Sequence, residues 1–301
     1  MRAGLDGSAQ GCTAWVARAV VMLATAALLA GCVGPSADGG RGGNGGDGYG
    51  GWGGNGYGGN GGNADGRTGA GGAPGVASGC FTDSTAVAGS GRLSSRTVDL
   101  SGVTSVVAEA DFMVHLRTGG PAQAVVTMDD NLVDRVNATV SGDELRLGIK
   151  PGCGVRNATL SAEVTVGRLD RLAASATSRV VLTSTVTNPA LQVVVSGAGS
   201  VTGPIRIDHL DAGVSGTGTL GLSGQVSELR LRAAGAGRLP MADLTVRNLD
   251  ATLSGASHAV VTVSDTLAVQ ATGASMLRYL GTPEITRSQT SGAATVVPDS
   301  G

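Results

Sequence analysis

The sequence predicts an all-β protein whose folded part is a β-solenoid with coils of about 19 residues, preceded by a disordered glycine-rich tether. Three observations support this fold class. A short motif returns at a nearly constant interval, apolar and polar residues alternate on both sides of it, and large rings are scarce. Beyond residue 80 the aromatic residues are Phe81, Phe112 and Tyr279. The core is therefore expected to be thin and filled by Val, Leu, Ile and Ala.

A motif of the Ser-Gly-Ala-Gly type establishes the repeat. Its second residue falls at positions 197, 216, 235, 255, 273 and 292, so the intervals are 19, 19, 20, 18 and 19 residues. A degenerate earlier copy reads Ser175-Ala176-Thr177-Ser178. A fixed period near 20 is typical of solenoids, in which each repeat stacks on its neighbours.

The residues around each repeat glycine alternate as in strands with one buried face. The positions six, four and two residues before the glycine are apolar in most copies, as in Leu191, Val193 and Val195. The position four residues after it is also apolar, as in Val201 and Leu220. Each coil should therefore contain a strand, a corner of small residues and a second strand. The glycine would supply a positive φ or a close stacking of backbones.

The segment before the repeat, about 91–160, also reads as β-structure. Strands are expected near residues 104–107, 111–116, 124–127 and 144–149, with a short helical turn at 130–134. A Gly-Gly-Pro turn at 119–121 separates two of these strands. The folded domain is thus expected to begin at about residue 91 and to run to residue 301.

This order of elements resembles the putative auto-transporter adhesin head GIN domain family. The resemblance covers roughly residues 96–298 and rests on four stretches: Phe112-Met113-Val114-His115-Leu116, then Val125-Val126-Thr127, then Asp130-Asn131-Leu132 leading to Leu145-Arg146-Leu147, and finally the small-residue coils. It implies a right-handed, β-helix-like fold on an exported or surface protein of bacteria. It implies no established activity, and adhesion follows as an expectation from the resemblance and the export signal.

Residues 1–32 predict a bacterial lipoprotein signal peptide. The apolar run from Ala19 to Ala30 is about a dozen residues long, shorter than the roughly 20 that span a bilayer. It ends in Leu29-Ala30-Gly31-Cys32, which resembles a lipobox. The expected product carries diacylglycerol on Cys32 and is held to the outer face of the bacterial cell membrane. The alternative is an ordinary signal peptide or an uncleaved anchor in which Cys32 has no role.

Residues 33–90 are expected to be the tether, because glycine at such density cannot offset the entropy of ordering the chain. Two cysteines remain beyond the signal and Cys32, namely Cys80 and Cys153. In an oxidising compartment they could form a disulfide, and the alternative is two free thiols. No Cys/His spacing indicates a metal site.

Composition and motifs exclude several function classes. The net charge of −2 predicts no attraction to nucleic acid, and no catalytic, cofactor or metal residue can be assigned. Asp129, Asp130 and Asp134 lack the alternating spacing of a calcium loop. Among the histidines, His115 has no recognisable partner. A second, His258, falls in an outward column of variable residues.

Acidic residues of the coils are the remaining candidates for a catalytic role. Polysaccharide-cleaving enzymes need carboxylates clustered on one face. Asp211 and Asp250 share a column, but Arg230 lies between them, so charge pairing between coils is expected instead.

Three functions remain open. The first is a non-catalytic, surface-exposed module for adhesion or interaction with an envelope polymer. The second is a structural or regulatory envelope protein that binds another protein, using the edge strand near residues 286–297. The third is a carbohydrate-active enzyme on a β-helix. A broad polar coil face would favour the first, and a cluster of facing acids the third.

Overall fold

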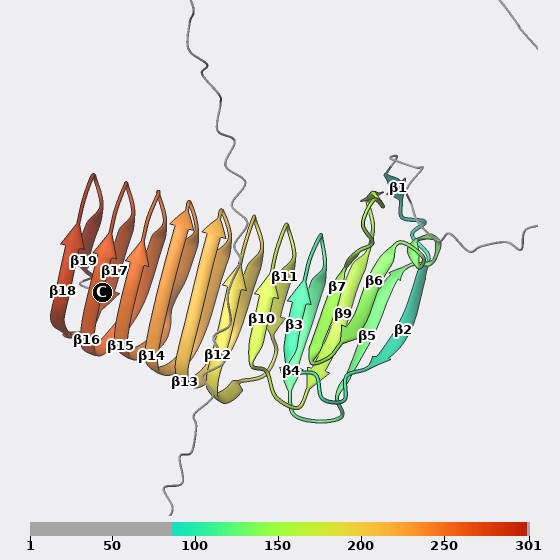
Figure 1. Cartoon of the computed structure of the whole chain (residues 1–301), viewed down its shortest axis with the longest axis horizontal. Helices are drawn as coiled ribbons and strands as arrows, with labels where there is room; N and C mark the ends of the chain where they lie inside the picture. Colours follow the sequence, from blue (N-terminus) through green and yellow to red (C-terminus); the bar gives the residue numbers. More distant parts are fainter. Residues whose placement is uncertain (1–85, 300–301) are drawn as a thin grey trace, which may run out of the picture. The chain divides into compact units, whose positions relative to one another are not determined.

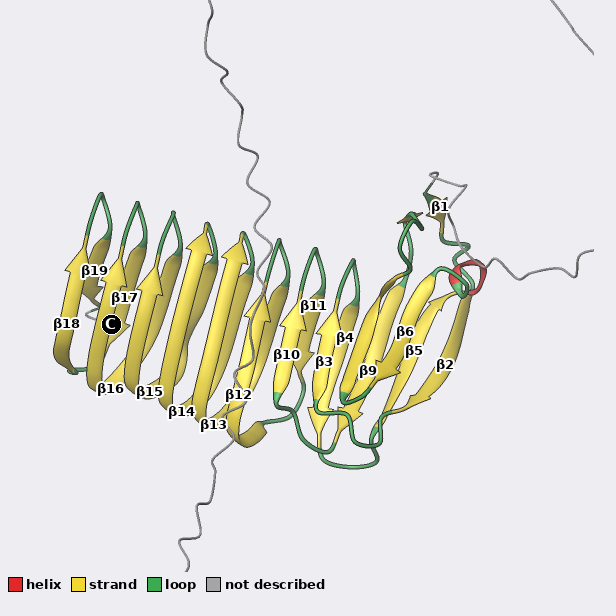
Figure 2. Cartoon of the chain, viewed as in Figure 1, coloured by secondary structure: helices red, strands yellow, loops and turns green. Residues whose placement is uncertain are grey.

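The computed structural model describes residues 86–299 and shows the predicted β-solenoid (Figure 1). Seventeen strands are hydrogen-bonded into one continuous sheet, which folds over into two facing layers. Parallel pairing between successive coils dominates, as in the long register between β13 (Ser200–Gly216) and β14 (Thr219–Gly235). Within the described residues, the regular secondary structure consists of strands and a single 3-10 turn, Asp130–Leu132 (Figure 2). That turn lies inside the predicted helical segment.

We call layer 1 the set of strand segments that run into the corners. In spatial order these are β6 (Val136–Ser141), β7 (Glu144–Ile149), β3 (Ser105–Ala108), β10 (Arg171–Ala174), the later parts of β12 (Val186–Val195), β13 (Ser200–Gly216), β14 (Thr219–Gly235), β15 (Arg238–Leu253) and β16 (His258–Ala271), and β18 (Glu284–Thr290).

Layer 2 is the set of segments that leave the corners. In spatial order these are β2 (Leu93–Asp99), β5 (Gln123–Asp129), β9 (Leu160–Val166), β4 (Met113–Thr118), β11 (Arg179–Leu182), the first parts of β13 to β16, β17 (Met276–Leu280) and β19 (Thr295–Pro298). A separate two-stranded pair joins β1 (Val87–Ala88) to β8 (Val155–Arg156). Strand β1 lies within the range that the sequence assigned to the tether.

The predicted corners are confirmed. The repeat glycines all adopt positive φ, from 64° at Gly197 to 97° at Gly235. Successive corners also stack on each other: the N–H of Thr217 donates to the carbonyl of Gly197 at 2.8 Å, and that of Ala236 to the carbonyl of Gly216 at 2.8 Å. The degenerate copy is also a corner, with Ala176 at a φ of 56°.

One corner was not predicted. Ala110 joins β3 to β4 with a φ of 58°, and its coil lies directly against the coil of Ala176. The two corner residues are 66 positions apart (176 − 110), rather than about 20. The intervening chain leaves the stack, builds the strands β5 to β9, and then returns beside β3 and β4.

The two ends of the stack differ. Antiparallel pairs, β2 with β5, β5 with β9 and β6 with β7, form a cap at the N-terminal end. At the other end the stack finishes with β18 and β19 (Figure 1). All seven residues of β18 are exposed. Its outer backbone edge has no strand partner among the described residues.

The core lies between the two layers and is thin, as expected. Leu191, Val193 and Val195 are at most 3% exposed, and the corresponding positions of the next coils are equally buried. Apart from Phe112, the largest fully buried side chains are Leu, Ile and Met. Each such side chain contributes about 1.5–3 kcal/mol when it leaves water. The stacked coils therefore share one continuous aliphatic core.

Candidate binding surface

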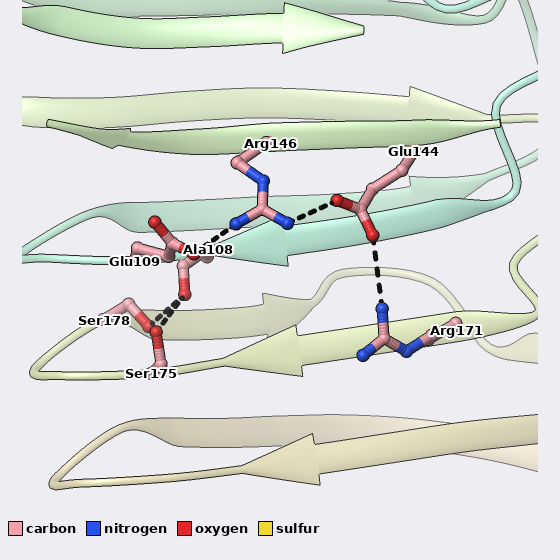
Figure 3. Close-up of polar contacts among 7 residues, drawn as sticks. All are labelled: Ala108, Glu109, Glu144, Arg146, Arg171, Ser175 and Ser178. Carbon is pink, nitrogen blue, oxygen red and sulfur yellow. Dashed lines mark hydrogen bonds and ion pairs between the residues drawn. The ribbon is translucent and has the colours of Figure 1, made fainter. Parts of the chain in front are cut away.

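Ion pairs cross the strands on the outer face of layer 1 near the cap (Figure 3). Arg146 donates to Glu109 and to Glu144, at 2.8 Å in each case. Glu144 also accepts from Arg171 at 3.2 Å. The Cα positions of Glu144 and Arg171 flank Ser105 in the register, and Ser105 is only 5% exposed. This network covers the surface of β3.

Charge pairing continues along the central coils, with different partners from those expected. Arg230 does lie between Asp211 and Asp250 in the column. However, Asp211 accepts from Arg232 at 2.9 Å, and Asp250 accepts from Arg287 at 2.9 Å. Arg230 makes no ion pair with any described residue. The predicted charge pairing between coils is thus confirmed, but its partners differ from those expected. The long arginine side chains reach acids at diagonal or more distant positions instead of the acid directly opposite.

A shallow groove of about 660 Å³ lies on the same face. Its polar lining consists of Arg168, Asp170, Gln192, His209, Asp211, Glu228 and Arg230. His209 Nδ1 lies 3.0 Å from Glu228 Oε2, and Arg168 donates to Asp170 at 2.6 Å.

The three carboxylates of this groove are each within 3.0 Å of a basic side chain. Glycoside hydrolysis requires two carboxyl groups that face the same bond, one of them protonated. The groove instead distributes its acids into separate pairs. Exposed pairs of this kind add at most about 1 kcal/mol to stability, so their main effect is to balance the charge of the face.

A different column runs along the outer face of layer 2. Its register positions are Ser95, Thr127, Ser161, Met113, Arg179, Ser200, Thr219, Arg238, His258, Met276 and Thr295. The part from Arg179 to Thr295 is the outward column predicted from the sequence, and His258 is exposed as expected. A groove of about 580 Å³ lies beside it, lined by Thr219, Arg238, Leu239, Pro240, His258 and Val260.

Asp129 is a buried anchor in the cap. It is 1% exposed, and its two carboxylate oxygens accept from the N–H groups of Gly91 and Thr159, each at 2.7 Å. The neighbouring Asp130 and Asn131 also bind the segment before β2 through Ser90. These side chains hold the start of the domain against the 3-10 turn. Within residues 86–299, no group of three or more His, Cys, Asp or Glu side chains is placed to hold a metal ion.

Asp99 serves a comparable local purpose at the end of β2. The Ser101 hydroxyl and, to a smaller extent, the Ser101 N–H donate to its carboxylate, and these bonds lower the pKa of Asp99. Asp99 lies at an exposed turn, so the two bonds from Ser101 stabilise the local conformation of the chain. Among residues 86–299, no helix is long and apolar enough to cross a bilayer.

Of the cysteines discussed above, Cys153 lies within the described residues. Cys32 and Cys80 lie outside the described residues. Cys153 is disulfide-bonded. Its pairing with Cys80 stays a prediction.

A family model described as putative auto-transporter adhesin, head GIN domain, matches residues 102–283. The chain belongs to this family. The match begins after β2 and ends before β18, so it spans the rest of the cap and most of the coils of the GIN domain. Comparison with curated proteins finds no relative of the chain.

Solved structures share this fold at low sequence identity. A putative adhesin from Bacteroides fragilis has a TM-score of 0.65 at 19% identity, covering 71% of this chain and 100% of its own. A putative adhesin from Parabacteroides merdae has a TM-score of 0.57 at 19% identity, covering 71% of this chain and 98% of its own. A protein described as a putative lipid binding protein from Parabacteroides distasonis has a TM-score of 0.58 at 16% identity, covering 71% and 100%. The family and the two adhesin structures are thus described as putative adhesins and not as enzymes.

The structure of the GIN domain also contains a histidine–carboxylate contact that the sequence did not predict. His115 Nδ1 lies 2.7 Å from Glu163 Oε1, because β4 and β9 pair in parallel with these two residues in register. They are 48 positions apart. No local motif could indicate this contact, since it depends on the excursion of the chain between β4 and β10.

Proposed function

We propose that this GIN domain is a non-catalytic binding module on the bacterial cell surface, where it adheres to a polymer of the cell envelope. The observation that supports the proposal best is the broad outer surface of the coils. The carboxylates of the groove on layer 1 lie in separate ion pairs with arginine and histidine, and the grooves are shallow. Such a surface can make many weak polar contacts over a long distance. Membership of an adhesin family agrees with this use.

We further propose that a lipid on Cys32 holds the protein to the outer face of the cell membrane, and that the glycine-rich residues 33–85, before β1, form the tether. At about 5–6 Å × √n, this length of glycine-rich chain has a typical reach of roughly 40 Å. The domain would then contact envelope material above the bilayer. In the same oxidising compartment, a Cys80–Cys153 disulfide would fix the start of the domain to the β8 region.

Two measurements test the proposal. The full-length chain, purified in detergent, should co-sediment with isolated cell envelope and be released by salt, because its contacts are polar and exposed. Absence of retention would contradict envelope adhesion. In cells, a Cys32→Ser variant should leave the membrane fraction. A Cys12→Ser variant, changed at the cysteine inside the predicted signal peptide, should stay there. Membrane retention of both variants would contradict the lipid anchor.

A second candidate function is the binding of another protein. It rests on the open end of the stack, where β18 is fully exposed and Ile285 is 48% exposed. An exposed edge strand can pair with a strand of a partner. Crosslinking in cells would favour this alternative if adducts form at β18 in a chain that does not bind isolated envelope.

A further inference from the structure

Unpaired basic side chains gather on the outer face of layer 2. Arg179 and Arg238 are exposed, and neither guanidinium makes a hydrogen bond or ion pair with any residue between 86 and 299. Both lie in the column described above, with Ser200 and Thr219 between them. His258 follows Arg238 in the next coil. No carboxylate occupies this column at any register position from Ser95 to Thr295.

This face differs from layer 1 in its electrostatics. On layer 1, most arginines are engaged by acids of neighbouring coils. On layer 2, the carboxylates of Glu163 and Asp299 are engaged by His115 and Arg278, which lie outside the column. The positive charge of Arg179 and Arg238 is therefore left uncompensated. No acid among the described residues forms an ion pair with either guanidinium.

The spacing of the column fits an extended ligand. Adjacent strands lie about 4.8 Å apart, so the backbone positions of Arg179 and Arg238, three coils apart, are separated by about 14 Å. The groove of about 580 Å³ beside Arg238 and His258 has a volume in the range typical of ligand sites. Hydroxyl groups lie between the two guanidinium groups. Charged and neutral hydrogen-bonding groups thus follow one line across the strands.

We propose that this column, defined as Arg179, Ser200, Thr219, Arg238 and His258, binds a linear polysaccharide that carries carboxylate groups. The chain of sugars runs across the strands, from coil to coil. Each guanidinium holds a carboxylate through a two-point hydrogen bond. The hydroxyls of Ser200 and Thr219 exchange hydrogen bonds with sugar hydroxyls. The inference rests on the proposed envelope adhesion and names the class of polymer.

The same observations disfavour other anionic partners. Recognition of an acidic membrane generally uses clusters of 4–8 Lys or Arg side chains, whereas the column has two arginines. Nucleic acid binding generally requires a strongly basic domain, and this chain has a net charge of −2. A narrow line of charge and hydroxyl groups is complementary to a single polymer chain.

Binding of polygalacturonate to the full-length chain tests the inference. Neutral dextran and vesicles of phosphatidylglycerol serve as comparison ligands. The Arg179→Gln/Arg238→Gln variant is matched by Arg206→Gln/Arg247→Gln, which removes the same charge from exposed arginines outside both the column and the groove of layer 1. We expect salt-sensitive binding of polygalacturonate, weakened about tenfold or more in the column variant. The matched variant should stay within about twofold of the wild type. Circular dichroism checks that both variants fold.

Three results would overturn the inference. One is a similar loss in both variants, which would indicate general charge attraction. Another is binding of the vesicles that equals binding of polygalacturonate and falls in the column variant, which would indicate a lipid surface. The third is absence of polygalacturonate binding by the wild-type chain. If that chain still co-sediments with isolated envelope, envelope adhesion stands and only the assigned polymer is wrong.

Discussion

At the corners of the solenoid, one residue decides whether the next coil can stack. Gly216 has a φ of 80°, and a Cβ added there would lie 2.6 Å from the carbonyl oxygen of Gly197. Glycine is therefore required for its backbone conformation and for its lack of a side chain. The sequence predicted this role correctly, because the glycines recur with the period of the coils.

Replacement of Gly216 by alanine should destabilise the domain by about 2 kcal/mol or more, since the left-handed conformation alone costs a side chain about 1–2 kcal/mol. Gly213 offers a matched control. A Cβ there meets nothing within 4 Å, so Gly213→Ala should be neutral or slightly stabilising. Urea unfolding measures both changes. Equal midpoints for the two variants would contradict the stacking account of the corners.

Buried acids were harder to interpret from the sequence. Asp129 belongs to a run of polar residues that resembles an exposed turn, and the donors to its carboxylate come from positions 38 and 30 residues away. Asp129→Ala should leave two buried N–H groups without acceptors and cost about 2 kcal/mol or more. Asp134→Ala, at an exposed position, should change stability by less than about 0.5 kcal/mol. Thermal unfolding of both variants distinguishes an anchor from a surface residue.

At the scale of an element, the corner tolerates residues other than glycine when the local stacking allows it. Ala110 and Ala176 form the two N-terminal corners with φ values of 58° and 56°. Their coils are adjacent in space although they are distant in sequence. The period could therefore reveal the corner at Ala176, which lies near the regular coils. It could not reveal the corner at Ala110, because the strands of the cap are inserted between them.

Two substitutions with opposite expected effects on stability test the strain at Ala176. Ala176→Gly should raise stability by about 0.5–1 kcal/mol, because glycine adopts positive φ without a steric penalty. Ala173→Gly, three residues earlier in the regular part of β10, should lower stability by a similar amount. Denaturant titration of both variants reports the two signs. A loss of stability in both would contradict strain at this corner.

At the scale of the whole molecule, the coils form a stack in which each contacts its neighbours. The sequence predicted the fold class, the coil length and the outward column of layer 2, since all three follow from one period. It could not predict the arrangement of the cap or most of the ion pairs of layer 1. Those depend on side chains that meet across long sequence separations, as Glu109 and Arg146 do.

A stack of equivalent coils should survive the removal of one of them. Residues 216–234 are 19 residues long, and their deletion joins Ser215 to Gly235, whose Cα partner in the neighbouring coil is Gly216. The shortened chain should keep its β-sheet circular dichroism signal and unfold cooperatively, with a modest loss of stability. Deletion of residues 216–225 shifts the strands out of register and should abolish folding. Similar behaviour of the two deletions would contradict the solenoid repeat.

The most direct test of the central claim, a surface module that binds without catalysis, combines retention and product analysis. The full-length chain is incubated with isolated cell envelope, the bound protein is quantified, and the supernatant is examined for sugar fragments by mass spectrometry. The account predicts stable retention and a supernatant free of protein-dependent fragments. Fragments that accumulate with time and disappear in the Asp211→Asn or Asp250→Asn variant would contradict it and show that the paired acids of layer 1 perform catalysis.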